Sequence, residues 1–223
     1  MALFFQTKII DSIIDRARWL SHNPSSLWIA LIFAASLILI GHQSIQVIDR
    51  DEARFAQASK QMVQTGDIIT VKFQDELRAK KPVGIYWLQS LSAAAFGVQD
   101  IASYRLPSLL GYIGSLLICY YFVRSLWPDS RHLQQLVATC LLGSSLVIFA
   151  EAHIAKTDSV LLFLCLAQQM LLWQFYKNRH QPVRESGWAW FWAIVALGIL
   201  IKGPIAPMLA IVTCAGLVAI DRE

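Results

Sequence analysis

The chain has 223 residues, of which 56% are hydrophobic and only 15% are charged, and its mean hydropathy is +0.50. Soluble domains are usually about 25% charged, so this composition excludes a soluble globular protein and predicts an integral membrane protein. The net charge of +4 is small, and we expect the chain to be surrounded by membrane lipid and to have no nucleic-acid partner.

Six apolar segments approach the roughly 20 residues that a membrane-spanning helix needs. In chain order they are residues 27–45, 103–126, 133–150, 159–176, 188–201 and 205–220. These segments predict an all-α polytopic membrane protein with a bundle of about six transmembrane helices.

The distribution of Lys and Arg predicts the orientation of the bundle, because cytoplasmic loops carry an excess of both residues. If residues 1–26 form a cytoplasmic segment, the inner side holds Lys8, Arg16, Arg18, Arg124, Arg131, Lys177, Arg179, Arg184 and Arg222. The two short outer loops then hold only Lys156 and Lys202. We therefore expect a cytoplasmic N-terminus.

The long outer loop, residues 46–102, departs from this rule. It keeps seven cations on the outer side: Arg50, Arg54, Lys60, Lys72, Arg78, Lys80 and Lys81. Acidic residues nearly balance them, but cations retained against the topological bias suggest an anionic ligand.

Two amphipathic surface helices are expected within this loop. Residues 51–65 carry apolar side chains on one side and polar ones mostly on the other, which suits a helix lying flat on the membrane, and Gly66 is a plausible end. Residues 67–73 suggest an extended piece and residues 74–77 a turn. Residues 82–97 then predict an interfacial or re-entrant helix, with Pro82 in its first turn. If this helix spanned the membrane, every later orientation would reverse.

Charged residues from five separate segments would meet at the outer face. They are Asp49, Arg50, Asp51, Glu52 and Arg54; Lys80 and Lys81; Arg105; Glu151, His153, Lys156 and Asp158; and Lys202. Ionisable groups close to the hydrocarbon are costly and usually functional. Arg54, Lys80, Lys81 and Lys202 could hold a phosphate or diphosphate, and a carboxylate such as Asp51 or Asp158 could accept a proton from a nucleophile or orient it.

Each of these features also has a plainer interpretation. Asp51 and Arg54 could be a solvated pair, Lys80 and Lys81 a headgroup anchor, and Lys202 part of a helix break. A different class of protein, a non-enzymatic transporter or binding protein with an outward-facing anion site, is the alternative. A transporter would place charges near the midplane on broken helices, often in two repeated halves, whereas these charges gather at one face.

Six short motifs resemble those of a known family. They are D-E-A-R-F at 51–55, T-G-D at 65–67, K-P-V-G-I-Y-W-L-Q at 81–89, R-L-P-S at 105–108, K-T-D at 156–158 and K-G-P at 202–204. Over residues 27–220 the chain resembles the N-terminal part of the ArnT-like membrane glycosyltransferases of family 39, which are related to the protein O-mannosyltransferases.

The resemblance implies a GT-C fold and transfer of a sugar from a polyprenyl-phosphate donor to a lipid A-type, protein or other periplasmic acceptor. It implies a bacterial inner-membrane protein whose active face is periplasmic. Members are considerably longer, so residues 27–223 are expected to be the N-terminal transmembrane region of such an enzyme.

The resemblance also assigns roles to residues. It implies that Asp51 is the catalytic acid, that Arg54 and Lys81 contact the lipid phosphate, and that Asp158 and Lys202 line the same cavity. Together with the charges described above, this leads us to expect a catalytic set of Asp51 and Asp158 and a substrate-binding set of Glu52, Arg54, Lys80, Lys81 and Lys202. The family often has an acidic residue directly before the lysine of the K-P motif, where this chain has Lys80. We therefore expect no metal and no cofactor.

Overall fold

The computed structural model describes residues 23, 25–47, 49–180 and 185–221, so most of the expected cytoplasmic segment 1–26 lies outside the described residues. The helices of the described part are α2 (Ser25–Leu39), α3 (Arg50–Thr65), α4 (Gly84–Phe96), α5 (Ile101–Leu126), α6 (His132–Gly143), α7 (Leu146–Ala152), α8 (Asp158–Lys177), α9 (Glu185–Lys202) and α10 (Ile205–Asp221). Two short strands, β1 (Lys72–Phe73) and β2 (Glu76–Leu77), form an antiparallel hairpin.

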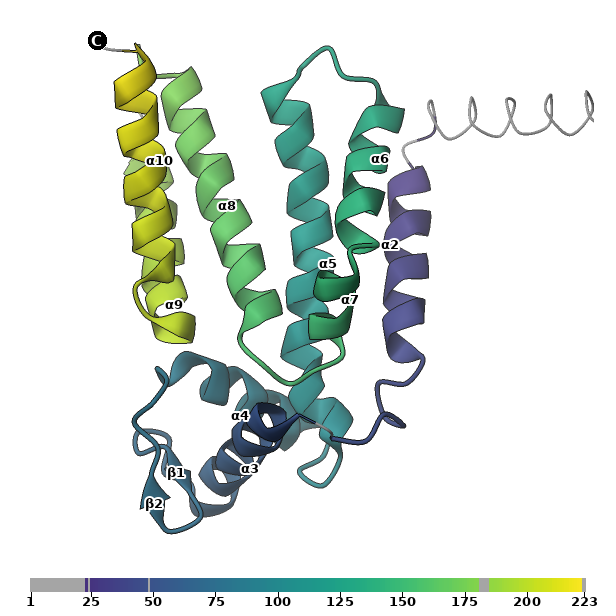
Figure 1. Ribbon diagram of the computed structural model, residues 1–223, viewed down its shortest axis with the longest axis vertical. Helices are drawn as coiled ribbons and strands as arrows, with labels where there is room; N and C mark the ends of the chain where they lie inside the picture. Colours follow the sequence, from purple (N-terminus) through teal and green to yellow (C-terminus); the bar gives the residue numbers. More distant parts are fainter. Residues whose placement is uncertain (1–22, 24, 48, 181–184, 222–223) are drawn as a thin grey trace, which may run out of the picture.

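The structure confirms the prediction of an all-α polytopic membrane protein. Among the described residues, α5, α8 and α9 are long and apolar enough to cross a membrane, and the bent pair α6–α7 makes up to a fourth span. The helices α2 and α10 are apolar but shorter, with 15 and 17 residues. Apart from the short helix α7, these helices stand side by side along the long axis of the molecule (Figure 1).

The prediction of one continuous helix over 133–150 is wrong, because α6 and α7 meet at an angle of 67°. Helices bend sharply at Gly and Ser pairs, and the break falls at Gly143, Ser144 and Ser145. The Tyr112 hydroxyl donates to the Gly143 carbonyl at 2.9 Å, which satisfies an acceptor that the break leaves free.

The helices α3 and α4 and the hairpin form a layer across one end of the bundle (Figure 1), which we call the end layer. The helix α3 begins after Asp49, whose side chain caps it, and ends at Gly66, whose φ of 71° is the left-handed conformation that glycine adopts readily. Phe55, Ala58 and Met62 form its buried side. The turn predicted for residues 74–77 contains only residues 74–75, because Glu76 and Leu77 form β2 and pair with β1.

Close backbone contacts fix the end layer and α8 in place. A Cβ atom at Gly111 of α5 would lie 2.7 Å from the backbone of Ser159 in α8, and one at Gly84 of α4 would lie 2.7 Å from the Leu200 carbonyl oxygen in α9. Small residues allow membrane helices to approach this closely. The two contacts therefore bring the start of α8 against α5 and the start of α4 against the end of α9.

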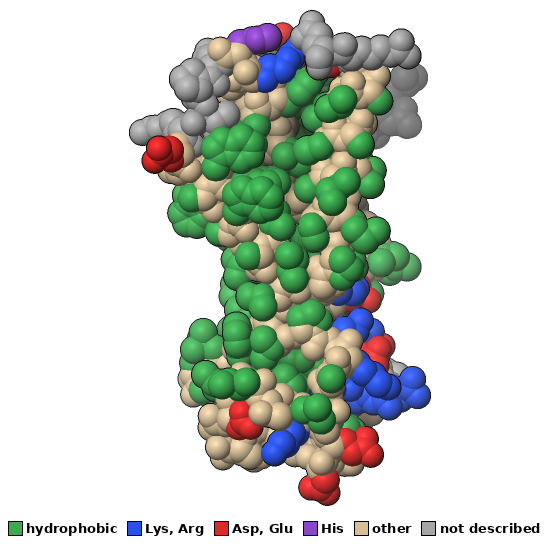
Figure 2. All heavy atoms as spheres, turned by 90° about the vertical axis from the view of Figure 1, so that its left-hand side faces the viewer, with side chains coloured by type: hydrophobic (Ala, Val, Ile, Leu, Met, Phe, Trp, Pro, Cys, Tyr) green, Lys and Arg blue, Asp and Glu red, His purple; other side chains and the backbone are tan. Residues whose placement is uncertain are grey.

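Hydrophobic side chains cover the middle of the face seen in Figure 2, whereas Lys, Arg, Asp and Glu gather toward its two ends. The apolar belt suits the hydrocarbon core of a bilayer, about 30 Å thick. The end layer lies at one of the charged ends.

Candidate active site

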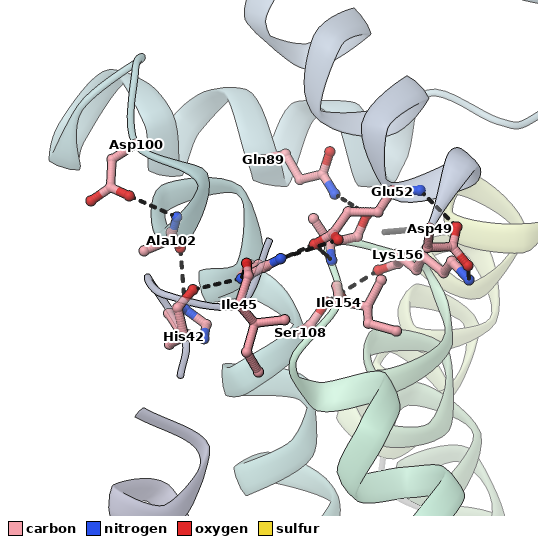
Figure 3. Close-up of polar contacts among 12 residues, drawn as sticks. His42, Ile45, Asp49, Glu52, Gln89, Asp100, Ala102, Ser108, Ile154 and Lys156 are labelled. Atoms are coloured by element: carbon pink, nitrogen blue, oxygen red, sulfur yellow. Dashed lines mark hydrogen bonds and ion pairs between the residues drawn. The ribbon is translucent and has the colours of Figure 1, made fainter. Parts of the chain in front are cut away.

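The first charged contact of the end layer joins the start of α3 to the link between α7 and α8. Asp49 Oδ1 accepts hydrogen bonds from the backbone N–H groups of Asp51 and Glu52 at 2.7 and 3.0 Å. Lys156 Nζ donates to Asp49 Oδ2 at 2.7 Å (Figure 3). The hydrogen bond from Lys156 is the main reason why the pKa of the Asp49 carboxyl is lowered. Burial lowers the pKa of Lys156, but the contact with Asp49 and other nearby acids outweighs it, so the net shift is upward.

Glu52 and Arg105 form a second contact, deeper in the molecule. The guanidinium donates to both carboxylate oxygens, at 2.7 and 3.1 Å, and the side chains are 2% and 1% exposed. Glu52 Oε1 also accepts from the Ala155 N–H at 2.9 Å, and Arg105 also donates to the carbonyls of His42 and Ile45 at 2.8 and 3.0 Å (Figure 3). The pair thus joins the segment after α2, the helices α3 and α5, and the α7–α8 link.

Asp51 and Arg54 lie on the exposed side of α3. Their side chains are 58% and 34% exposed, and the nearest oxygen and nitrogen are 3.8 Å apart. Asp51 lies two residues after the α3 cap Asp49, yet its side chain takes no part in the contacts that engage Asp49 and Glu52. Its carboxylate remains accessible to a ligand.

Asp158 and Lys202 form a third pair, between the first residue of α8 and the last residue of α9. A carboxylate suits a helix N-terminus and an ammonium suits a C-terminus, so both helix dipoles favour this arrangement. The contact brings two expected site residues together, although they are 44 positions apart in the sequence.

The ion pairs connect these residues into one charged cluster. Lys156 pairs with Asp49, which lies two residues before Asp51, and Lys156 itself lies two residues before Asp158, which pairs with Lys202. The Asp49–Lys156 contact therefore brings Asp51 and Asp158 into the same charged region at the end of the bundle.

Lys80 and Lys81 lie in the exposed segment between β2 and α4. Neither ammonium has a hydrogen bond or an ion pair with any residue that the structure describes. The contact of Gly84 with Leu200 brings this segment to the end of α9, which carries Lys202. Two unpaired cations thus border the cluster.

Sequence reasoning placed Asp49, Arg105, Glu151 and Lys156 at this face but assigned them no partners or roles. In the Arg105–Glu52 and Lys156–Asp49 pairs the two residues are 53 and 107 positions apart in the sequence. No rule based on local sequence spacing predicts a contact at such a separation. Within the described ranges, no three His, Cys, Asp or Glu side chains come together in a way that could hold a metal ion.

The bundle, the end layer and the charged cluster define a multi-pass membrane protein with a polar site at one end of its helices. The family model of dolichyl-phosphate-mannose-protein mannosyltransferases matches residues 25–221, so the chain belongs to that family. This finding confirms the resemblance found in the sequence motifs.

Several bacterial enzymes are similar to this chain in sequence. The chain is 27% identical over 185 residues to an undecaprenyl phosphate-alpha-4-amino-4-deoxy-L-arabinose arabinosyl transferase of Pseudomonas fluorescens (strain Pf0-1), covering 83% of this chain and 33% of the relative. It is 30% identical over 161 residues to the enzyme of the same name from Pseudomonas aeruginosa (strain LESB58), covering 72% and 29%. The chain therefore spans about a third of the length of these relatives.

The fold is similar to that of ArnT from Cupriavidus metallidurans. The crystal structure of the apo state matches with a TM-score of 0.75 and 17% identity, over 90% of this chain and 37% of that one. The crystal structure of the same protein bound to undecaprenyl phosphate matches with a TM-score of 0.71 over the same shares.

Proposed function

We propose that the protein to which this chain belongs is a membrane glycosyltransferase that moves a sugar from a polyprenyl-phosphate donor to a lipid A-type or other periplasmic acceptor. Membership of the mannosyltransferase family supports the reaction class. The names of the relatives make undecaprenyl phosphate-linked 4-amino-4-deoxy-L-arabinose the first donor to test.

The observation that carries the proposal is the unequal pairing of the acids in the cluster. Asp49, Glu52 and Asp158 each have a close cation partner, in Lys156, Arg105 and Lys202 respectively. Asp51 has only Arg54 at 3.8 Å and is mostly exposed. Glu151 also forms no ion pair among the described residues, but it is less exposed than Asp51. A general base must have an oxygen that is free to accept a proton and accessible to substrate, and Asp51 is the most exposed acid of the cluster.

The reaction follows from this arrangement. The acceptor oxygen forms a bond to the anomeric carbon while the bond from that carbon to the phosphate oxygen breaks. The proton of the acceptor hydroxyl passes to Asp51, and the bonding electron pair leaves with the phosphate. In the proposal, Arg54, Lys80, Lys81 and Lys202 bind the donor phosphate and stabilise the negative charge that grows on it.

Two residues of the expected site take modified roles in the proposal. Glu52 is buried and fully engaged with Arg105 and Ala155, so we assign it the positioning of Asp51, the residue before it, rather than contact with substrate. Asp158 is the second carboxylate of the site and holds Lys202 in place.

We place the charged cluster on the periplasmic face of the bacterial inner membrane, with residues 46–102 as an outer loop and the N-terminus in the cytoplasm. The excess of Lys and Arg in the opposite loops supports this orientation. A polyprenyl phosphate would then present its head group at the depth of the cluster while its chain remains in the bilayer.

The test uses the full-length protein, reconstituted with undecaprenyl phosphate-linked 4-amino-4-deoxy-L-arabinose and lipid A. Asp51→Asn keeps the shape of the side chain and removes the base, so transfer should fall by about 10²- to 10⁴-fold. Asp75→Asn, in the exposed turn of the hairpin, is the matched control and should keep full activity. Full transfer by Asp51→Asn would contradict the proposed base.

A further inference from the structure

A small cavity lies between α7 and α8, next to Asp158. Its volume is 240 Å³, and it is lined by the apolar residues Val147, Ile148 and Leu162 and by Glu151, Asp158 and Ser159, and we call it the Glu151 pocket. Pockets for drug-sized ligands measure roughly 300–1,000 Å³, so this one suits a single small group.

Two polar atoms of the pocket residues have no partner. Glu151 Oε2 and Ser159 Oγ are buried and form no hydrogen bond with any residue of the described ranges, and Ser159 is only 3% exposed. A buried polar atom without a hydrogen bond is costly, and native structures rarely retain two in one place without a reason. The pair therefore points to a ligand that donates hydrogen bonds.

The charges around the pocket indicate which kind of hydrogen-bond donor would fit in it. Lys202 pairs with Asp158 and Lys156 pairs with Asp49, whereas Glu151 forms no ion pair within the part of the chain that the structure describes. The Glu151 carboxyl is thus the acid of the pocket that has no cation partner of its own among the described residues. An ammonium group offers three N–H donors together with a positive charge, so it complements both features.

We infer that the Glu151 pocket binds the ammonium group of an amino sugar, with the Glu151 carboxylate accepting from the ammonium and Ser159 Oγ completing its hydrogen bonds. This inference rests on the proposed function, since the amino sugar is the group that the donor carries. Ser159 directly follows Asp158, which pairs with Lys202, so a sugar seated in the pocket would lie beside Lys202, one of the cations assigned to the donor phosphate. The pocket would select amino sugars from among neutral ones.

The experiment measures binding to the full-length protein in lipid nanodiscs. Two donors are compared, undecaprenyl phosphate-linked 4-amino-4-deoxy-L-arabinose and undecaprenyl phosphate-linked L-arabinose, which has a neutral hydroxyl in place of the amine. Undecaprenyl phosphate without a sugar serves as a third ligand. The wild-type protein should bind the amino donor roughly tenfold more tightly than the neutral one, the scale of one hydrogen bond between charged groups.

Glu151→Gln preserves shape and removes the charge, so it should bring this ratio close to one without changing the affinity for undecaprenyl phosphate. Ser159→Ala is a second, milder variant and should lower the ratio in the same direction. Glu185→Gln is the matched control, because Glu185 is an exposed acid at the start of α9, the end opposite to Lys202. Its ratio should equal that of the wild type.

Two results would overturn the inference while leaving the proposed function intact. One is a wild-type protein that binds undecaprenyl phosphate but does not distinguish the two donors. The other is an unchanged ratio in both Glu151→Gln and Ser159→Ala. A wild-type protein that binds none of the three ligands would instead overturn the proposed function, and the inference with it.

Discussion

The Glu52 carboxylate and the Arg105 guanidinium face each other in two parallel hydrogen bonds, in a place where neither side chain is more than 2% exposed. Glu52 directly follows Asp51, so the pair fixes the backbone that carries the proposed base. The same guanidinium holds the carbonyls of His42 and Ile45, which fixes the segment leading into α3.

Breaking this pair on one side should destabilise the protein strongly, because the remaining charge stays buried without a partner. We expect Arg105→Ala or Glu52→Ala to lower the free energy of unfolding by about 3–5 kcal/mol. Arg105→Lys keeps the positive charge but loses the bidentate hydrogen bonding, so its free energy of unfolding should lie between those of the wild type and Arg105→Ala. Thermal unfolding in detergent measures the series, and Glu76→Ala in the exposed strand β2 is the control. A loss below about 1 kcal/mol for both Ala variants would argue against a structural pair.

The Asp49–Lys156 pair predicts a particular dependence of stability on pH. The pKa of Asp49 is lowered from its ordinary value of 3.8, so its contribution is present above pH 3.8 and is lost as the pH falls through the lower, folded-state value. The pKa of Lys156 is raised from 10.5, so its contribution is present below pH 10.5 and is lost as the pH rises through the higher, folded-state value. Stability from the pair should therefore be constant across the neutral range.

Asp49→Asn separates this ion pair from the helix cap, because Asn caps a helix about as well as Asp. The difference in unfolding free energy between wild type and Asp49→Asn should be constant near neutral pH and should shrink below pH 3.8. Asp49→Ala loses the cap as well, which adds about 0.5–2 kcal/mol of destabilisation at every pH. A wild-type advantage over Asn that persists unchanged at the lowest pH would exclude the ion pair as its source.

The contact at Gly111 should tolerate no side chain. A Cβ atom there would meet the backbone of Ser159 at 2.7 Å, and backbone atoms cannot move aside as a flexible side chain can. We expect Gly111→Ala to cost about 1–3 kcal/mol, the usual range for overpacking. Gly216 in α10 has nothing within 4 Å of its missing Cβ, so Gly216→Ala is the matched control and should be neutral or stabilising. Equal melting temperatures for the two variants would contradict the tight α5–α8 contact.

The sequence predicted the helices well because the length of an apolar run is a local property that hydrophobicity measures directly. It missed the bend at Ser144 because apolar residues continue on both sides of that position. The Gly-Ser-Ser triplet was nevertheless a local signal for a kink. The gathering of charged residues at one end could be predicted from the topology, because the topology determines the depth of each residue in the membrane. The ion pairs between those residues could not be predicted, because the lateral position of a residue depends on how the helices pack. The close contacts at Gly111 and Gly84 that fix this packing appear only in the three-dimensional structure.

The orientation of the bundle can be tested by labelling. In a background without Cys119, Cys140, Cys165 and Cys214, a cysteine at Gln74 should react with an impermeant reagent added from the periplasmic side. A cysteine at Asn178, at the end of α8 opposite to Asp158, should stay unlabelled until the membrane is opened. The reverse pattern would place the charged cluster in the cytoplasm and overturn the proposed localisation.

Lys81 gives the sharpest test of the phosphate site, because its ammonium is exposed and has no partner among the described residues. Lys81→Ala should therefore leave the melting temperature unchanged, yet weaken the binding of undecaprenyl phosphate by roughly tenfold or more, as expected when a charged hydrogen bond is lost. Lys81→Arg keeps the positive charge but changes the geometry, so it should retain part of the affinity. Lys72→Ala, an exposed lysine of β1, is the matched control for the loss of one positive charge from the end layer. If Lys81→Ala and Lys72→Ala weaken binding equally, Lys81 acts only through the general positive field of the end layer and does not contact the phosphate.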